Sequence, residues 1–137
     1  MNKAIICDID GTLALKQDRD PYDHKKSDTD LLCKEVKNLL VLYKSNGYKI
    51  IIFTGRQIRF KEVTLQWLQT NQVEYDIIEF RKDDDNRIDS EVKFEMYNKF
   101  IKDKYDIEFV LDDRNQVVDM WRKELGLKCF QVNYGDF

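Results

Sequence analysis

The sequence predicts an α/β fold in three layers, a mainly parallel sheet of five strands with helices on both faces. Short apolar segments of strand length alternate with longer segments whose apolar residues recur at helical spacing. The connections between these segments are short, as in strand–helix–strand units with parallel strands and right-handed crossovers. Polar residues follow directly where several apolar segments end, which is typical of the ligand-binding edge of such a sheet.

The first two predicted elements are a strand and a helix. Residues 4–7 are apolar and end at Asp8, as expected of a buried strand that emerges at a carboxylate. Residues 29–45 carry apolar side chains at helical spacing, and an Asn-Gly pair follows as a typical helix stop. This alternation of a strand with a helix is the first unit of the predicted fold.

The remaining elements repeat the same alternation. Residues 48–53 are apolar and predict a second strand, and residues 60–69 place Val63, Trp67 and Leu68 on one face of a helix. The later elements are a strand, helix, strand, helix and strand at residues 75–80, 90–101, 107–111, 116–125 and 127–132. The sheet therefore receives five strands from one chain.

Size and composition predict one folded domain. The chain has 137 residues, a formal net charge of −3 and 42% hydrophobic residues, so it can bury one substantial core. The charge excludes a surface that is basic throughout, and any contact with nucleic acid must be local. No signal peptide or membrane-spanning segment is evident, and the three cysteines lie far apart, so we expect a cytoplasmic protein with reduced thiols and no membrane contact.

Polar residues cluster where the predicted strands end. They are Asp8 and Asp10, Thr54, Arg81, and Asp112 with Asp113. Helix caps and turns also use Asp and Thr, but they account for one or two of these positions rather than for four strands that end alike. Clustered carboxylates repel one another unless they hold a cation, and all-oxygen ligands suit Mg²⁺. The pattern therefore predicts a magnesium site that shares the oxygens of a substrate phosphate.

Four short motifs occur in the order typical of haloacid dehalogenase-like (HAD) phosphohydrolases. DIDGT at residues 8–12 resembles the opening signature DxDG[TS] of that family. FTGR follows at residues 53–56, then Lys93 at the start of a predicted helix, and LDD at residues 111–113. The resemblance implies a single Rossmann-like domain over residues 1–137. The intervals between the motifs are too short for a large cap domain.

The resemblance implies a catalytic role for each polar residue of these motifs. Asp8 would attack phosphorus and form an aspartyl-phosphate. Asp10 would protonate the leaving group and then take a proton from the hydrolytic water. The Thr54 hydroxyl and the Gly55 main-chain N–H would hold the phosphoryl oxygens, and Lys93 would add positive charge beside them.

The same resemblance implies the ligands of the magnesium ion. These are one carboxylate oxygen of Asp8, the main-chain carbonyl of Asp10, the side chain of Asp112 and, through water, Asp113. Gly11 would allow the tight turn that follows Asp10. The magnesium ion and the nucleophile would then share one end of the sheet.

A closer resemblance, over nearly the whole chain, is to the phosphatase domain of bacteriophage-type polynucleotide kinase/phosphatase. The similar segments are residues 8–19, 21–23, 112–122 and 135–137. That family removes 3′-phosphates from polynucleotide ends and nucleotides, so the resemblance implies these substrates. Arg19 and Arg81 match arginines that contact substrate phosphate there, as suits a planar guanidinium. Arg56 either contacts the substrate or braces its loop, and His24 is a possible stacking surface.

The kinase half of that family has no counterpart in this sequence. The phosphate-binding pattern GxxxxGK[ST] is absent, so a separate kinase or ligase is the partner that the resemblance suggests. Two alternatives stay open. In the first alternative, the chain is a phosphatase of a small phosphorylated metabolite, which the net negative charge favours. In the second, it is an inactive module that binds nucleic-acid ends or a partner protein.

Overall fold

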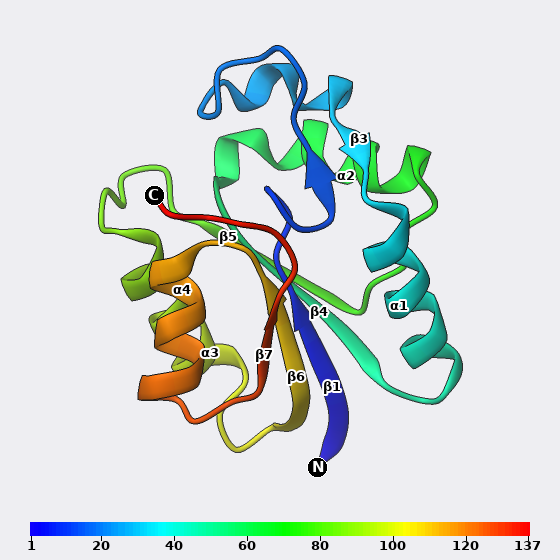
Figure 1. Ribbon diagram of the computed structural model, residues 1–137, viewed down its shortest axis with the longest axis vertical. Helices are drawn as coiled ribbons and strands as arrows, with labels where there is room; N and C mark the ends of the chain where they lie inside the picture. The colour runs from blue at the N-terminus through cyan, green and yellow to red at the C-terminus, as the bar shows by residue number, and fades with distance from the viewer.

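A parallel sheet of five strands forms the centre of the computed structural model, which describes residues 1–137 (Figure 1). Every pair of neighbouring strands is parallel. The strand order across the sheet is β5 (Ile77–Arg81), β4 (Lys49–Gln57), β1 (Asn2–Cys7), β6 (Tyr105–Asp112) and β7 (Cys129–Gln131). The predicted α/β class with five mainly parallel strands is confirmed.

Helices cover both faces of this sheet. Side chains of α1 (Lys34–Ser45) and α2 (Lys61–Thr70) pack into the core on one face. Those of α3 (Asp89–Phe100) and α4 (Asn115–Asp119) pack into the core on the other, as Figure 1 shows. The molecule therefore has the three predicted layers.

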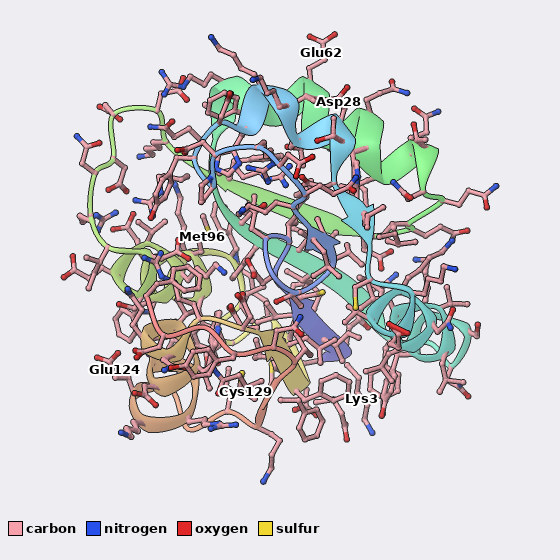
Figure 2. All side chains as sticks on the ribbon, turned by 45° about the horizontal axis from the view of Figure 1, so that its top comes forward. Lys3, Asp28, Glu62, Met96, Glu124 and Cys129 are labelled. Atoms are coloured by element: carbon pink, nitrogen blue, oxygen red, sulfur yellow. The ribbon has the colours of Figure 1, made fainter.

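The central strand β1 contributes to both cores because successive side chains of a strand point to opposite faces. Ile5 and Cys7 join the core under α1 and α2, whereas Ala4 and Ile6 join the core under α3 and α4. All four side chains are almost completely buried. Charged side chains project outward around these cores (Figure 2). A strand that is apolar on both faces explains the uninterrupted apolar run in the sequence.

The strand order reverses at β1, and this reversal places the site. β1 pairs with β4 on one side and with β6 on the other. The connection after β1 leads to α1 on one face of the sheet, and the connection after β6 leads to α4 on the other face. Open α/β sheets bind ligands in the crevice that forms at such a point. Asp8 follows β1, while Thr54 and Asp112 lie toward the carboxyl ends of its two neighbours.

Residues 30–33 are not helical, contrary to the prediction, and Thr29 ends a 3₁₀ helix instead of opening an α-helix. His24–Thr29 form a 3₁₀ helix, and β3 (Leu31–Leu32) pairs antiparallel with β2 (Ala14–Leu15). Helix α1 therefore begins at Lys34. The prediction failed because the apolar residues of β3 lie at helical spacing from those of α1, while their partner strand is distant in sequence. Local periodicity cannot reveal such a pairing.

Two other elements differ from the prediction near their ends. β4 continues through Gln57, so the motif at residues 53–56 belongs to the strand rather than to the loop after it. The predicted helix at residues 116–125 starts as α4, and a π-helical turn, Met120–Glu124, continues it. None of the helices has the length and apolar character needed to cross a membrane. The cytoplasmic location stays a prediction.

Candidate active site

Three buried carboxylates and one buried ammonium group meet at the carboxyl ends of β1 and β6. Asp8, Asp112 and Asp113 each offer an oxygen within 4.8 Å of the others. The Nζ atom of Lys93 on α3 lies 2.7 Å from Asp8 Oδ1 and 3.1 Å from Asp112 Oδ2. The fold thus brings together residues that lie far apart in the chain. Asp8 and Asp113 are separated by 105 positions.

Burial and mutual repulsion set the protonation of this cluster. Burial, followed by the charge of Asp112, raises the pKa of Asp8 well above its usual value, although Lys93 opposes the rise. Burial also raises the pKa of Asp113. For Lys93, burial alone would lower the pKa, but Asp112 and Asp8 raise it well above its usual value. Lys93 is therefore charged, and the carboxylates need more positive charge than it provides.

Hydrogen bonds fix the orientation of each carboxylate. The Thr12 hydroxyl lies 3.2 Å from Asp8 Oδ2 and 3.4 Å from Asp113 Oδ1, so its single hydrogen can be donated to either carboxylate. Asp112 accepts bonds from the indole Nε1 of Trp121 at 3.2 Å and from the main-chain N–H of Asp113 at 2.9 Å. The carboxylates are held in place before any substrate arrives, which is the preorganisation that catalysis by charge requires.

The charge and chemistry of the cluster fit a magnesium ion. Lys93 is the sole cationic side chain that forms an ion pair within this cluster, with Asp8 and Asp112, so one positive charge faces up to three negative ones. Carboxylate oxygens are the ligands that Mg²⁺ prefers. The side chain of Asp10 is not part of this cluster, because it points to two arginines. The main-chain carbonyl of Asp10, not its side chain, is the metal ligand that the family resemblance implies.

Gly11 allows the loop of residues 8–12 to approach Asp113. Its φ is +83°, and a Cβ atom built there would lie 2.1 Å from Asp113 Oδ2. A Gly11→Ala change should therefore displace Asp113 and should also impose backbone strain of about 1–2 kcal/mol. We expect at least a 10-fold loss of phosphatase activity, on the order of 1.4 kcal/mol in the barrier, measured as kcat/KM with a generic phosphate ester.

Gly47→Ala is the matched control for this change. Gly47 has a φ of +88°, but no atom lies within 4 Å of the Cβ that would be added. The control should lose a similar amount of stability by thermal unfolding and keep full activity. Equal activity losses in the two variants would show that strain, not the contact with Asp113, explains the effect.

A second charged cluster surrounds Asp10. Arg56 donates to both carboxylate oxygens of Asp10, at 2.9 Å through Nε and 2.8 Å through a terminal nitrogen. Arg19 adds a bond of 3.1 Å to Asp10 Oδ1. Both arginines also bond to Asp30, whose side chain is completely buried. Two guanidinium groups and two carboxylates thus balance one another, and the cluster orients Asp10.

This arrangement keeps Asp10 ionised in the free protein. Burial raises the pKa of Asp10, but hydrogen bonds from Arg56 and the charges of Arg56 and Arg19 lower it below its usual value. The side chain of Arg56 is 0% exposed, so it braces Asp10 in this structure and does not face the solvent. Of the two roles left open for Arg56, the geometry favours bracing.

Arg81 is likewise held by groups of the protein. Its Nε atom donates to Gly55 O at 2.9 Å, and a terminal nitrogen bonds to Asp89 Oδ1 at 3.1 Å. Further bonds reach the main-chain carbonyls of Asp85 and Arg87. Arg81 therefore ties the loop between β5 and α3 to the end of β4, close to the start of the helix that carries Lys93.

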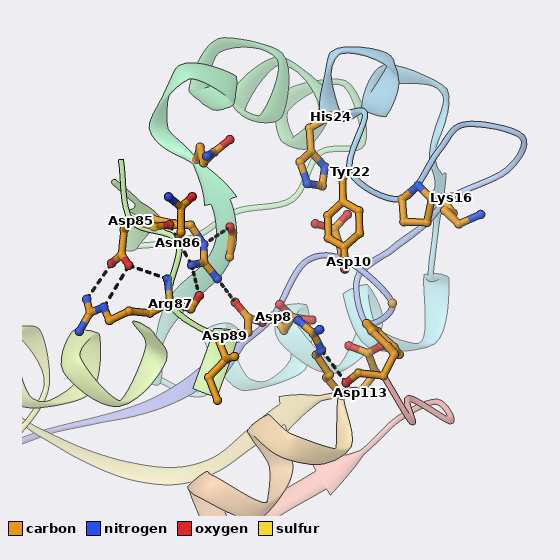
Figure 3. Close-up of a pocket in the computed structure, with 18 of the residues that line it drawn as sticks. Asp8, Asp10, Lys16, Tyr22, His24, Asp85, Asn86, Arg87, Asp89 and Asp113 are labelled. Carbon is orange, nitrogen blue, oxygen red and sulfur yellow. Dashed lines mark hydrogen bonds and ion pairs between the residues drawn. The ribbon is translucent and has the colours of Figure 1, made fainter. Parts of the chain in front are cut away.

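An open cleft of about 980 Å³ gives access to these clusters (Figure 3). Six of the predicted site residues line it: Asp8, Asp10, Arg19, Gly55, Arg81 and Asp113. Four others lie behind this surface and are buried: Thr54, Arg56, Lys93 and Asp112. Lys93 nevertheless contacts Asp8, whereas the hydroxyl oxygen of Thr54 accepts a bond from the Arg56 main-chain N–H at 3.1 Å.

Three residues that organise the site are not predicted from the sequence. Asp30 holds the two arginines, Trp121 bonds to Asp112, and Asp89 lies 3.1 Å from Arg81 and 3.8 Å from Lys93. No local motif marks these residues. His24 lines the cleft and touches the edge of Phe60, with its ring centroid 5.4 Å away.

Comparisons with known proteins agree with this geometry. Residues 2–137 match the family model described as the polynucleotide kinase PNKP phosphatase domain. The chain is 29% identical over 126 residues to a protein of Autographa californica nuclear polyhedrosis virus named "Putative bifunctional polynucleotide kinase/RNA ligase". That match covers 88% of this chain but 18% of the viral protein.

Solved structures show the same fold. One chain of the "Structure of Pnkp1/Rnl/Hen1 complex" is 50% identical, with a TM-score of 0.98 over 100% of this chain and 48% of that one. The "Putative Phosphatase from Clostridium difficile" is 17% identical, with a TM-score of 0.66 over 100% of this chain and 89% of that one, and it supports the fold alone. The chain thus spans less than half the length of the viral and Pnkp1-complex relatives. The motifs, the site geometry and the match over residues 2–137 together show that the chain belongs to the family of polynucleotide kinase PNKP phosphatase domains, within the HAD-like fold.

Proposed function

We propose that residues 1–137 form one magnesium-dependent phosphomonoesterase domain, which forms an aspartyl-phosphate on Asp8 and removes 3′-phosphate from polynucleotide ends or nucleotides. One observation carries the proposal. The carboxylate of Asp8 reaches an open cleft while Lys93 and Thr12 hold it from behind, and Asp10 lies in the same cleft. A nucleophile and a proton-transfer group are thereby presented to one substrate.

The reaction then proceeds in two displacements. In the first, an oxygen of Asp8 bonds to phosphorus, the bond from phosphorus to the leaving oxygen breaks, and Asp10 gives that oxygen a proton. In the second, Asp10 takes a proton from a water molecule whose oxygen attacks the phosphorus, and the bond to Asp8 breaks. Lys93 faces the negative charge on Asp8 throughout.

The protonation of Asp10 changes during this cycle. The ionised form that the arginines favour is the one needed to take a proton from water in the second step. A phosphate bound in the cleft brings negative charge near Asp10, which raises its pKa and supplies the protonated form for the first step. The clamp by Arg56 and Arg19 thus suits a group that must act as acid and base in turn.

The magnesium ion would be held by the cluster described above. Asp8, Asp112 and Asp113 offer carboxylate oxygens, and Asp10 offers its main-chain carbonyl. When bound, the ion supplies positive charge to the phosphoryl oxygens and offsets the repulsion between the carboxylates. Chelation with EDTA should therefore remove activity, and added Mg²⁺ should restore it.

The relatives support the choice of nucleic acid as the substrate. The family model describes a phosphatase domain of polynucleotide kinase, and the viral relative is named as a kinase and ligase. A relative of 50% identity is solved in a complex with Rnl and Hen1. We therefore propose that this chain works beside a kinase or ligase, either on the same polypeptide or as a separate protein.

The test compares matched oligonucleotides that carry a phosphate at the 3′ end or at the 5′ end, in the presence of Mg²⁺. We expect phosphate release from the 3′ end alone. Release from a sugar phosphate with equal or better kcat/KM would overturn the preferred substrate and favour a small-metabolite phosphatase. No release from any ester, with intact folding, would favour an inactive binding module.

A further inference from the structure

An exposed aromatic ring stands in the wall of the active-site cleft. Tyr22 is 72% exposed, and it lines the same cleft as Asp8 and Asp10. Figure 3 shows Tyr22 and Asp10 among the residues that line this cleft. Its hydroxyl has no hydrogen-bond partner within the protein. A large ring left open beside a phosphate site offers a flat apolar surface to whatever is attached to that phosphate.

The segment that carries this ring is fixed relative to the catalytic residues. The main-chain N–H of Tyr22 donates to Asp20 Oδ1 at 2.9 Å. Arg19 donates to the main-chain carbonyls of Asp20 and Pro21 at 3.2 and 3.1 Å, and the same guanidinium bonds to Asp10. One arginine therefore ties the segment before the ring to the proton-transfer group. A ring on a preorganised segment loses little entropy when it binds a ligand.

The other groups on the cleft walls fit a charged chain better than a compact ester. Lys16 and Arg59 line the cleft, and neither forms an ion pair with a carboxylate. Arg59 contacts the side-chain oxygen of Gln57 and the ring of Phe60. These two cations are available to further phosphates. An aromatic surface combined with free cations is the arrangement by which proteins hold single strands without reading their sequence.

We propose that Tyr22 stacks on the base of the 3′-terminal nucleotide while its 3′-phosphate lies at Asp8, so that the cleft selects strand ends over small phosphate esters. This inference rests on the proposed function. A nucleotide whose base is stacked on Tyr22 has its phosphate directed into the cleft, and the rest of the strand passes Lys16 or Arg59. Stacking is tolerant of sequence, so all four bases are accepted.

The test measures kcat/KM for Tyr22→Ala on three substrates. They are a 3′-phosphorylated oligonucleotide, the same oligonucleotide with an abasic 3′-terminal residue, and glycerol 2-phosphate, a small ester without a ring. Loss of one stacked base typically weakens binding by on the order of 10-fold. We expect that loss on the intact oligonucleotide, and little change on the abasic one and on the small ester. Tyr22→Phe should behave like the wild type because the ring remains.

Tyr134→Ala is the matched control, since Tyr134 is 85% exposed but does not line the cleft. It should leave all three activities unchanged. If Tyr22→Ala has no effect on the intact oligonucleotide, or lowers kcat/KM equally on all three substrates, the stacking role is wrong while the proposed function stands. If the wild type hydrolyses the small ester but not the oligonucleotide, the proposed function fails, and this inference fails with it.

A binding measurement separates stacking from turnover. In the Asp8→Asn background, an oligonucleotide with 2-aminopurine at its 3′-phosphorylated terminal position should lose fluorescence when it binds, because stacking quenches the base. The additional change Tyr22→Ala should abolish most of that quenching. Unchanged quenching in the double variant would overturn the assignment.

Discussion

Replacement of Asp8 by asparagine is expected to abolish turnover of every phosphate ester while the fold remains intact. The amide has the size of the carboxylate but cannot form the acyl phosphate, so we expect a loss on the order of 10⁴-fold or more in kcat. The change also removes one of three clustered carboxylates and leaves Lys93 paired with Asp112. Thermal unfolding should therefore show no large loss of stability.

The matched control is Asp106→Asn at the start of β6, on the protein surface. It should keep full activity, since it lies at the opposite end of its strand from Asp112. Rapid quenching followed by mass spectrometry should detect phosphate on Asp8 in the wild type and none in Asp8→Asn. Full activity in Asp8→Asn would refute the covalent mechanism.

The part of the site that lies at the ends of strands could be predicted from the sequence. Asp8, Asp10 and Asp112 each follow or end an apolar run, and in a parallel sheet the ends of such runs meet at one edge. Lys93 needed the order of the family motifs, because its helix carries other lysines. For these residues a local pattern and a sheet rule are sufficient.

The supporting residues could not be predicted in this way. Asp30 lies 20 positions after Asp10 and 26 positions before Arg56 in the sequence. Its carboxylate contacts Arg56 only because the chain folds back on itself. The apolar spacing predicts a helix over residues 29–45, and that prediction does not say which way the carboxylate of Asp30 points. Trp121 lies in the helix predicted at residues 116–125. It is buried in the core, and its indole N–H also donates to Asp112. Such dual roles depend on contacts between distant parts of the chain, and the spacing of apolar residues does not reveal these contacts.

The same limit applies to the arginines. The family resemblance implies that Arg19 and Arg81 contact substrate phosphate, a task that suits a guanidinium, and it leaves Arg56 between substrate contact and bracing its loop. In the structure Arg56 and Arg81 are occupied by groups of the protein, and Arg19 divides its bonds between Asp10 and Asp30. In this structure the bonding partners of the three arginines belong to the chain itself. Arg19 and Arg81 also line the cleft, and their contact with a substrate phosphate stays a prediction.

Removal of the charge of Asp30 should therefore have the largest effect on stability. The Asp30→Asn side chain keeps its volume, but its NH₂ group would face guanidinium donors where an oxygen now accepts bonds. Arg19 and Arg56 would retain Asp10, whose side chain is 37% exposed, as their remaining carboxylate partner. Breaking a buried ion pair on one side typically costs about 3–5 kcal/mol, and we expect a loss of this size in the free energy of unfolding.

Denaturant unfolding measures this loss, and kcat measures its consequence for Asp10. The matched control is Asp28→Asn, an exposed residue of the 3₁₀ helix that ends just before Asp30 (Figure 2), and it should change neither quantity. Combining Asp30→Asn with Arg19→Met should cost less than the sum of the two single changes, because each change alone leaves a buried charge without its partner. Strict additivity, or an Asp30→Asn protein as stable and active as the wild type, would show that Asp10 is held without Asp30. The arginine cluster would then act through Asp10 alone.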